Sequence, residues 1–445
     1  MSPTTPLEQT FQSLLASRQS RSLRRQLTLP PPDSIDFSSN DYLSLRTSAA
    51  IRTAYLAELN SPQPFPSVPG SDNSTTNTPP PLFPLGSGGS RLLDGNSAYA
   101  LSLESSIAAF HRAHSGLLFT TGFDANVGLL SSAPQPGDVV VYDALVHASM
   151  HDGMRLSRAG ARIPFGHNDA GALRSVLEGL VARDEKVRTG ERNVFVAVES
   201  VYSMDGDVAP LAAMVEAVEA VLAGGNGYVV VDEAHATGVC GARGRGLVCA
   251  LGLERRVFAR VHTFGKAMGC AGAIVLASPL TRDYLINYAR TLIYTTAPPF
   301  PLLANIRVVY DYLARGDADA SIHHLHTLYH ALHAQLTHLI ASLPATNPPL
   351  LSLVSPLSLT PSNPIAPAPT PILPIYTPHP RSLASHCQRQ GYMVRPVVPP
   401  TVPAGAARVR VCLHAGNTGA EVRGLVGCVR GWVGGVLKEG ERAML

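Results

Sequence analysis

A lysine in an unusual setting, Lys266, is the first residue of this sequence that points to chemistry. It lies in the stretch VHTFGKAMGCAG, residues 261–272, among small and apolar side chains and without an acidic neighbour in the segment. A lysine in such a place can bury its stem and extend its amine to water. It can instead keep a reactive amine, because burial disfavours the charged form. The segment alone leaves both interpretations open.

Two further polar residues, Asp232 and His235, end a strand-like run. The run is GYVVVDEAH, residues 227–235, in which apolar residues lead directly into the acids. Ligands bind at the carboxyl ends of strands in open α/β sheets, and a buried carboxylate there needs a partner. The letters DEAH also occur in helicases, but a helicase requires an earlier GxxxxGK[ST] loop for phosphate, and the sequence has none. A chance acid at a strand end remains the other interpretation.

Taken together, the three residues suggest a site for pyridoxal phosphate. Lys266 follows Asp232 by 34 residues and lies in a turn that contains glycine, and His235 lies three residues after the aspartate. In such sites a lysine forms a Schiff base with the cofactor, and an aspartate keeps the pyridine nitrogen protonated so that the ring accepts electrons. The sequence therefore predicts an enzyme that uses this cofactor.

The surrounding elements predict an α/β fold. Helical patterns alternate with β-branched runs between residues 100 and 300, and the strand candidates are 138–143, 193–200, 227–235 and 272–278. This alternation favours a mostly parallel sheet covered by helices. Beyond Pro298 and Pro299, leucines at helical spacing predict one long helix; they are Leu325, Leu328, Leu332, Leu336 and Leu339.

The chain is expected to divide into three parts. Residues 1–45 form an N-terminal segment, 46–300 a large cofactor-binding α/β domain, and 301–445 a smaller α+β domain. Within the large domain, residues 60–84 consist largely of Pro, Ser, Thr and Asn. A segment of this composition cannot bury much apolar surface, so we predict a disordered-like insertion without a packed core.

Composition limits the classes of partner. A net charge of +3 over 445 residues gives no basic footprint for nucleic acid, and no uncharged run is apolar over the length that a membrane span requires. The six cysteines are far apart and indicate reduced thiols in an intracellular protein. Histidines 323, 324, 326, 330, 333 and 338 fall on the predicted leucine helix without interleaved thiolates or acids, so we expect surface residues and no metal.

Longer motifs resemble one enzyme family. In chain order they are DFSSNDYLSL, GSGGSRLLDGNS, TTGFDANVGLL, DALVHASMHDG, FGHND, VESVYSMDGDVAPL, VDEAHATGVCGARGRG, HTFGKAMG, IYTTAPP and PPTVPAGAARVRV. With these motifs the chain resembles the α-oxoamine synthases, pyridoxal phosphate enzymes of fold type I that condense an amino acid with an acyl-CoA. The resemblance covers nearly the whole chain outside 60–84 and parts of 340–375, and it implies a homodimer.

The resemblance also implies roles around the cofactor. Lys266 would be the Schiff-base lysine and the base, Asp232 would pair with the pyridine nitrogen, and His147 would stack on the ring. His235 and Ser203 would bond the phenolic oxygen. The groups that would hold the phosphate are the backbone N–H groups of Gly122 and Phe123 and the hydroxyls of Thr263 and of the neighbouring subunit's Thr295 and Thr296.

For the substrates, the resemblance implies a second set of residues. Arg410 would bind the α-carboxylate of the amino acid with help from Asn40, and Thr401 would lie beside the acyl group. Arg24, after the first helix, would line the acyl-CoA entrance. Because cleavage of a transit peptide would remove Arg24, we expect the N-terminus to stay uncleaved. Cytoplasm is the expected compartment, with the peroxisome as the alternative because the final Ala-Met-Leu is a degenerate Ser-Lys-Leu address.

Within the family, the motif PPTVPAG favours one branch. That branch joins L-alanine to pimeloyl-CoA, or to pimeloyl carrier protein, and forms 8-amino-7-oxononanoate, CoA and CO2 for biotin biosynthesis. It commonly reads IRPPTVP, whereas this chain has Val398 where the arginine belongs and Arg395 three residues earlier. The departure bears on recognition of the far carboxylate of the acyl chain.

Other members of the family remain alternatives. Glycine C-acetyltransferase and 5-aminolevulinate synthase share most of the motifs, so the resemblance alone leaves the amino acid and the acyl group open. A silent partner subunit, as occurs in the serine palmitoyltransferase branch, is the alternative that is not an enzyme. Lys266 is present together with Asp232, His147 and His235, which favours an active enzyme.

Overall fold

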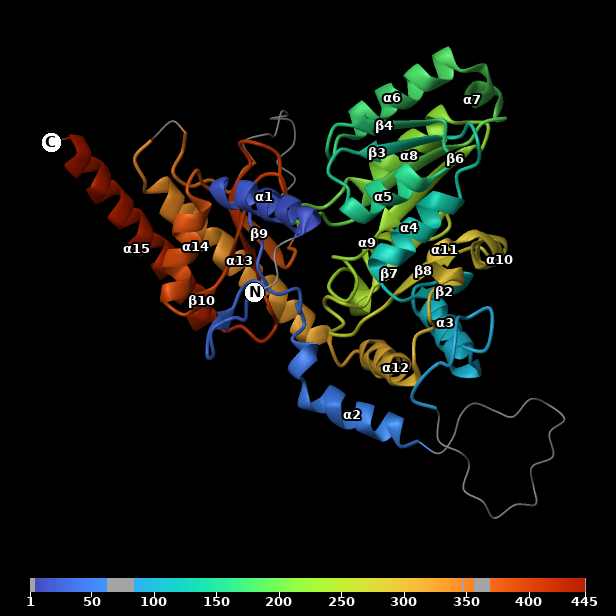
Figure 1. Ribbon diagram of the computed structural model, residues 1–445, viewed down its shortest axis with the longest axis horizontal. Helices are drawn as coiled ribbons and strands as arrows, with labels where there is room; N and C mark the ends of the chain where they lie inside the picture. Colours follow the sequence, from blue (N-terminus) through green and yellow to red (C-terminus); the bar gives the residue numbers. More distant parts are fainter. Residues whose placement is uncertain (1–4, 62–83, 346–347, 356–368, 445) are drawn as a thin grey trace.

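The computed structural model describes residues 5–61, 84–345, 348–355 and 369–444. Figure 1 shows a sheet covered by helices on one side of the molecule and the C-terminal elements, together with α1, on the other. The insertion predicted at 60–84 lies almost wholly outside the described residues. No helix within the described ranges is both long and apolar enough to cross a bilayer.

The large region is built on a seven-stranded sheet with the order β2-β8-β7-β6-β5-β3-β4. Its strands are β2 (Ser115–Phe119), β3 (Val139–Asp143), β4 (Ala161–Phe165), β5 (Val194–Glu199), β6 (Gly227–Asp232), β7 (Ala259–Thr263) and β8 (Ala273–Ala277). Neighbouring strands are parallel except at β8, which is antiparallel to both β2 and β7. The predicted mostly parallel sheet is therefore confirmed. Every residue of β5 is buried, which fits its apolar run from Val194 to Val198 before Glu199.

Three strands were not among the sequence candidates, namely β2, β4 and β7. Strand β4 lies at the edge of the sheet, alternates in exposure and contains Pro164, which edge strands tolerate. Strand β7 contains Arg260 and His262, both of which are buried despite their polarity. Because Arg260 and His262 interrupt the apolar pattern, the sequence did not predict β7, although Lys266 lies just after it.

Helices cover this sheet and connect its strands. They are α3 (Ala98–Phe110), α4 (Gly122–Ser132), α5 (Ala148–Leu156), α6 (Ala170–Arg183), α7 (Glu185–Thr189), α8 (Leu211–Val221), α9 (Leu247–Ala250), α10 (Pro279–Tyr288) and α11 (Arg290–Ile293), with a short 3-10 turn at Ala242–Gly244. Helix α4 packs on α5, and α6 packs on α8. Connecting loops leave the sheet at the carboxyl ends of β3, β5, β6 and β7.

The C-terminal region contains a three-stranded antiparallel sheet in the order β11-β12-β9. Its strands are β9 (Ile372–Tyr376), β11 (Arg395–Val397) and β12 (Arg408–Cys412), and its helices are α12 (Phe300–Arg315), α13 (Asp319–Ala341), α14 (Pro380–Arg389) and α15 (Gly419–Met444). The N-terminal segment joins this region, because β1 (Ile35–Asp36) pairs in parallel with β10 (Tyr392–Met393). The other N-terminal helices are α1 (Pro6–Ser20), a 3-10 turn at Leu45–Thr47 and α2 (Ala49–Leu59).

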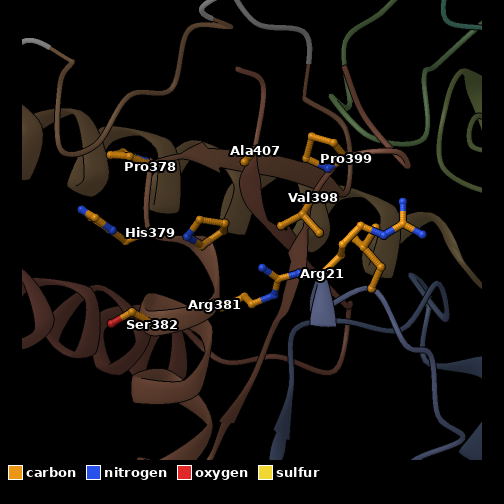
Figure 2. Close-up of a pocket in the computed structure, with 10 residues that line it drawn as sticks. Arg21, Pro378, His379, Arg381, Ser382, Val398, Pro399 and Ala407 are labelled. Atoms are coloured by element: carbon orange, nitrogen blue, oxygen red, sulfur yellow. The ribbon is translucent and has the colours of Figure 1, made fainter. Parts of the chain in front are cut away.

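A surface pocket of about 510 Å³ lies where the N-terminal segment meets the C-terminal region (Figure 2). It is lined by Arg21 and Leu23 from the segment after α1, by Arg381 at the start of α14, and by Val398 and Pro399 after β11. The side chain of Arg381 also donates a hydrogen bond to the Ser22 carbonyl at 2.7 Å. The pocket therefore lies beside the position where the sequence departs from its family, and Lys266 does not line it.

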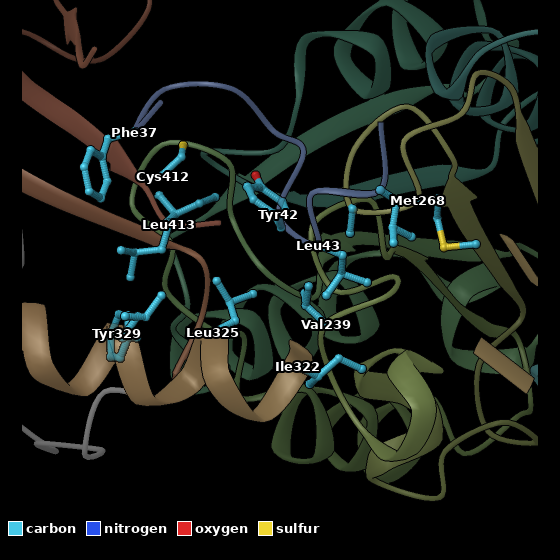
Figure 3. Close-up of a cluster of buried hydrophobic side chains, with 14 of the residues drawn as sticks. Phe37, Tyr42, Leu43, Val239, Met268, Ile322, Leu325, Tyr329, Cys412 and Leu413 are labelled. Atoms are coloured by element: carbon cyan, nitrogen blue, oxygen red, sulfur yellow. The ribbon is translucent and has the colours of Figure 1, made fainter. Parts of the chain in front are cut away.

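One hydrophobic core joins the N-terminal segment, the loops after β6 and β7, helix α13 and the end of β12. Figure 3 shows side chains from all of these parts packed together: Phe37, Tyr42, Leu43, Val239, Met268, Ile322, Leu325, Tyr329, Cys412 and Leu413. All five leucines of the predicted stripe on α13 are buried, which confirms the predicted helix and its buried face. The prediction of surface histidines on this helix is wrong for His326 and His333, which are half-buried because they flank the leucines.

Candidate active site

Lys266 and His235 lie together at the carboxyl ends of β7 and β6. The Nζ atom of Lys266 is 2.9 Å from Nε2 of His235, and Nδ1 of His235 is 2.7 Å from the hydroxyl of Tyr42. Tyr42 comes from the N-terminal segment, more than 190 residues away in the chain, and is fully buried. Residues that are distant in sequence thus form one hydrogen-bonded group around the lysine amine.

The group continues from Tyr42 to Arg410 on β12. The Tyr42 hydroxyl donates to Oδ1 of Asn40 at 3.0 Å, and Nη2 of Arg410 donates to the same oxygen at 3.1 Å and to Tyr42 at 3.3 Å. Nε of Arg410 donates to the Ser203 carbonyl at 2.7 Å. A hydrogen-bonded chain therefore connects the predicted base, Lys266, with the predicted carboxylate-binding arginine.

Burial sets the protonation of this group. Burial lowers the pKa of Lys266, although the nearby carboxylates of Asp232 and Glu199 oppose the shift. Burial, reinforced by the positive charges of Lys266 and Arg410, holds the pKa of His235 well below its ordinary value. A neutral His235 can donate from Nδ1 to Tyr42 and accept from Lys266 at Nε2, since Tyr42 donates to Asn40. The arrangement favours an amine that can act as nucleophile and base.

Asp232 is held at the end of β6 by donors on both of its oxygens. Nδ2 of Asn126 donates to Oδ2 at 2.7 Å, and the backbone N–H of Ala234 donates to Oδ1 at 2.8 Å. Asn126 lies on α4 and also contacts the Ser149 hydroxyl at 3.0 Å. These donors favour the ionised carboxylate, which is the form that pairs with a protonated ring nitrogen.

His147 begins helix α5 and takes part in its first turn. Its Nδ1 accepts from the backbone N–H of Ser149 at 3.2 Å and lies 2.8 Å from the hydroxyl of the same serine. Since Ser149 also contacts Asn126, the histidine is connected to the Asp232 group through two side chains. Burial lowers the pKa of His147, while Asp232 opposes the shift. A neutral, fixed ring in this position suits stacking on a cofactor.

The start of α4 provides a place for a phosphate. The helix begins at Gly122, where a Cβ atom would come within 3.0 Å of the Thr263 hydroxyl oxygen. The first N–H groups of a helix have no intrahelical acceptor and attract anions. Thr121 caps the helix by accepting from the Asp124 N–H at 3.0 Å, which leaves the earlier N–H groups for a ligand. Gly122, Phe123 and Thr263 are thus brought together as predicted.

The residues present fit pyridoxal phosphate at its pyridine nitrogen, at the carbon that a lysine would bond and at part of its phosphate. Asp232 supplies an ionised carboxylate for the pyridine nitrogen, and Lys266 supplies a buried amine with a lowered pKa. The start of α4 with Thr263 supplies phosphate donors. Ser203 is half-buried in the turn after β5, and its carbonyl is already bonded to Arg410.

Four predicted residues lie apart from this group. Thr296 forms an isolated antiparallel bridge with Ser90 of the GSGGSR motif, and Thr295 is half-buried beside it. Arg24 and Thr401 are exposed, and the Thr401 N–H donates to the Val398 carbonyl at 3.1 Å. Their assigned roles, toward a neighbouring subunit and an acyl substrate, stay predictions.

Sequence reasoning missed four residues of the site. They are Tyr42, Asn126, Ser149 and Glu199. All four lie inside the quoted motifs, but a buried tyrosine or asparagine in a motif is indistinguishable from a core residue without its partners. Burial, with the neighbouring Asp232 charge, raises the pKa of Glu199 well above its ordinary value. Among the described residues no three His, Cys, Asp or Glu side chains are grouped for a metal.

Comparison with known proteins places the chain among enzymes. The family model described as aminotransferase class I and II matches residues 32–429. The chain is 52% identical to an 8-amino-7-oxononanoate synthase of Emericella nidulans over 96% of both chains. It is 39% identical to the aminoacyl transferase sphA of Aspergillus fumigatus, over 92% of this chain and 83% of that protein. A solved structure of SPT with a PLP internal aldimine matches its fold with a TM-score of 0.77 and 23% identity, covering 96% of this chain and 98% of that one.

Proposed function

This chain belongs to the aminotransferase class I and II family, within its α-oxoamine synthases, and we propose a reaction for it on that premise. It is a pyridoxal phosphate-dependent acyltransferase. L-Alanine condenses with pimeloyl-CoA, or with the carrier-protein thioester, to give 8-amino-7-oxononanoate, CoA and CO2 in biotin biosynthesis. The observation that carries the proposal is the identity, over nearly the full length of both chains, to a protein named 8-amino-7-oxononanoate synthase.

The cofactor and the protein divide the chemistry between them. When bound, pyridoxal phosphate supplies an electron sink that weakens the bonds to the Cα atom of the amino acid. Asp232 would hold its pyridine nitrogen, the start of α4 with Thr263 would hold its phosphate, and His147 would cover its ring. The carboxylate of Asp232 is already fixed by Asn126 and Ala234, so no reorganisation is needed when the ring binds.

Lys266 is the group that moves protons at Cα. Burial lowers the pKa of its amine, which favours the neutral form of Nζ that can act as a base. Its hydrogen bond to Nε2 of His235 fixes the direction of the amine, and Tyr42 in turn fixes the imidazole. Because the three residues come from different segments, the position of the base depends on the packing of the N-terminal segment against the cofactor loops.

Arg410 orients the amino acid through its carboxylate. Its Nε is bonded to Ser203 and its Nη2 to Asn40 and Tyr42. Within the described part of the chain the two Nη1 hydrogens have no acceptor, so they are available to a carboxylate. A guanidinium held on three sides provides both charge and direction, which a free side chain would not.

A condensation assay tests the proposal directly. Purified protein with pyridoxal phosphate is given L-alanine and pimeloyl-CoA, and free thiol release is measured together with the mass of the product. We expect turnover with this pair to exceed turnover with glycine and acetyl-CoA. Faster reaction with glycine and acetyl-CoA would keep the enzyme class and overturn the proposed substrates.

A second candidate is another condensation of the same class, with a different amino acid or acyl chain. Two observations favour it: the 39% identity to the aminoacyl transferase sphA, and Val398 in place of an arginine. A panel of L-alanine, glycine and L-serine against pimeloyl, acetyl and palmitoyl thioesters distinguishes the candidates. The amino acid and thioester with the highest kcat/KM identify the reaction.

We also propose that the active unit is a homodimer. Helix α1 has no buried residue and exposes Leu7, Phe11, Leu14 and Leu15, an apolar face that a second copy of the chain would cover. In the dimer, Thr295 and Thr296 complete the phosphate site of the neighbouring subunit. Mixing Lys266→Ala chains with Thr295→Ala/Thr296→Ala chains is then expected to restore part of the activity. A fully active monomer at working concentration contradicts the proposal.

A further inference from the structure

The ring of His167 lies between two carboxylates outside the cofactor group. Its Nδ1 is 2.9 Å from Oδ1 of Asp143, at the end of β3, and its Nε2 is 2.8 Å from Oδ2 of Asp207, in the turn after β5. The ring also packs edge-on against Tyr202, with centroids 4.4 Å apart. We refer to His167, Asp143 and Asp207 as the His167 clamp.

Both nitrogens of His167 face acceptors, so both must carry hydrogen. A neutral imidazole can donate from one nitrogen only, whereas the imidazolium donates from both. Burial of the ring opposes the charge, but hydrogen bonds to Asp143 and Asp207 outweigh burial and raise the pKa of His167 to about 10. The neighbouring Asn168 strengthens the clamp, because its backbone N–H donates to Asp143 at 2.8 Å and its side chain donates to Asp207 at 2.7 Å.

The turn that contains Asp207 contacts the C-terminal region on its other side. Asp205 accepts hydrogen bonds from Arg408 on β12 and from the Tyr376 hydroxyl on β9. The Gly206 carbonyl accepts from the Thr370 hydroxyl at 2.7 Å, and a Cβ atom on Gly206, whose φ is +69°, would collide with the Ile372 carbonyl at 2.2 Å. The turn is therefore pressed between the sheet of the large region and the strands of the C-terminal region.

The same turn also holds the substrate arginine. The Ser203 carbonyl accepts from Nε of Arg410 at 2.7 Å, one of the three contacts that fix this guanidinium. Asp207 stabilises the turn from the opposite end, since the Tyr202 N–H donates to the Asp207 carbonyl at 3.0 Å and the Gly206 N–H donates to the Tyr202 carbonyl at 2.9 Å. The Asp207 side chain, which bonds His167 and Asn168, therefore connects the clamp to the turn that orients Arg410.

We propose that His167 is a positioning residue for the amino-acid substrate. Its imidazolium fixes residues 203–207 to the carboxyl ends of β3 and β4, and this turn holds Arg410 in the direction that the carboxylate requires. The inference rests on the proposed function of Arg410. The His167 clamp acts on the turn that bonds Arg410 through the Ser203 carbonyl, and none of its three residues contacts Arg395 or Thr401 at the proposed acyl end. Its loss is therefore expected to affect the amino-acid substrate, and the cofactor through Ser203, more than the thioester.

The test compares His167→Ala, His167→Gln and Asp207→Asn with a control, His330→Ala, whose side chain is exposed on α13. KM for L-alanine and for pimeloyl-CoA, kcat, and amide hydrogen exchange of residues 203–207 are measured on the holoenzyme. We expect His167→Ala to raise KM for L-alanine about tenfold, to leave KM for the thioester within about twofold, and to speed exchange of the turn. His167→Gln keeps one hydrogen-bond donor and is expected to have a KM for L-alanine between those of the wild type and His167→Ala. Asp207→Asn replaces His167→Ala in the comparison if His167→Ala does not fold.

The outcomes separate this inference from the proposed function. If the wild type turns over L-alanine, and both His167→Ala and Asp207→Asn have the wild-type KM for L-alanine, the clamp has no positioning role and the inference is overturned. If the wild type does not use L-alanine, the proposed function fails instead. The clamp is then judged by the exchange of residues 203–207 alone, which must rise in the variants for the inference to stand.

Discussion

The cofactor end and the acyl end of this molecule are built in opposite ways. At the cofactor end, Lys266 is half-buried and bonds the buried residues His235 and Tyr42 in a chain of hydrogen bonds. At the proposed acyl end, Arg395 and Thr401 are exposed, and among the described residues the Arg395 side chain donates long hydrogen bonds of 3.4 and 3.5 Å to the Thr28 hydroxyl.

The difference teaches where reaction type and substrate choice are determined. Buried polar groups are costly unless each is paired, so the cofactor end tolerates few substitutions and specifies the chemistry. Exposed side chains contribute little energy each, so the acyl end can vary without loss of the fold. Changes at the two ends should therefore differ in size by orders of magnitude.

The largest effect is expected from Lys266→Ala. The substitution removes both the covalent attachment of the cofactor and the base at Cα, so turnover should fall by at least about 10³-fold. The buried amine already has a lowered pKa, so its loss should leave the fold intact. Condensation kinetics and circular dichroism check the two parts. Lys186→Arg, at an exposed lysine on α7, is the matched control and should retain activity.

Two arginines that face each other across β11 and β12 sharpen the comparison. Arg395 and Arg410 are register partners, yet Arg410 is buried and Arg395 is exposed. Arg410→Ala removes the buried, hydrogen-bonded guanidinium. It should raise the activation free energy for the amino acid by about 2–3 kcal/mol, which lowers kcat/KM by about 30- to 150-fold. Arg395→Ala should cost no more than about fivefold. Equal losses in the two variants would show that exposure does not separate their roles.

The His167 clamp predicts a pH dependence of stability. The folded pKa of His167, about 10, lies above the ordinary value of about 6.5, so the clamp stabilises fully below pH 6.5 and loses its contribution as pH rises toward 10. Burial opposes ionisation of Asp143, but hydrogen bonds from His167 and from the Asn168 and Leu145 N–H groups outweigh it and lower the pKa of this carboxyl. Burial raises the pKa of Tyr202, which packs on the ring, well above its ordinary value. The Tm difference between wild type and His167→Ala should therefore shrink between pH 7 and pH 10. A constant difference would mean that the ring is neutral in the clamp.

The smallest effect is expected from Val398→Arg. A cation restored beside the surface pocket should favour a thioester with a far carboxylate over one without it, by about threefold, because exposed charge pairs contribute little. The ratio of kcat/KM for pimeloyl-CoA to that for heptanoyl-CoA measures the preference, and Val398→Ala is the control for volume. A preference for heptanoyl-CoA after the change would place acyl recognition elsewhere.

The sequence predicted the parts of the fold that follow from hydrophobic pattern. The runs at 138–143, 193–200, 227–235 and 272–278 became β3, β5, β6 and β8, and the leucine stripe became α13. Strand β7 was missed because Arg260 and His262 are buried by partners that a single segment does not reveal: Cys249 for the arginine, Thr237 for the histidine.

The sequence predicted those site residues whose role is recognisable from their own segment of the chain. Lys266, Asp232 and His235 are identifiable from their types and spacing. Tyr42 contacts His235 across 193 positions of sequence, and such a partnership depends on how the N-terminal segment packs, which no local pattern records. The same holds for His167, whose two carboxylates come from different strands and turns.

One measurement tests the central claim, that Lys266 is the buried amine that carries the cofactor. The chain has three lysines, Lys186, Lys266 and Lys438, and of these only Lys266 is not exposed. Holoenzyme is reduced with borohydride, digested, and its peptides are identified by mass spectrometry. The account predicts a pyridoxyl group on Lys266 alone, and none in Lys266→Ala. A pyridoxyl group on Lys186 or Lys438, with Lys266 unmodified, would contradict it.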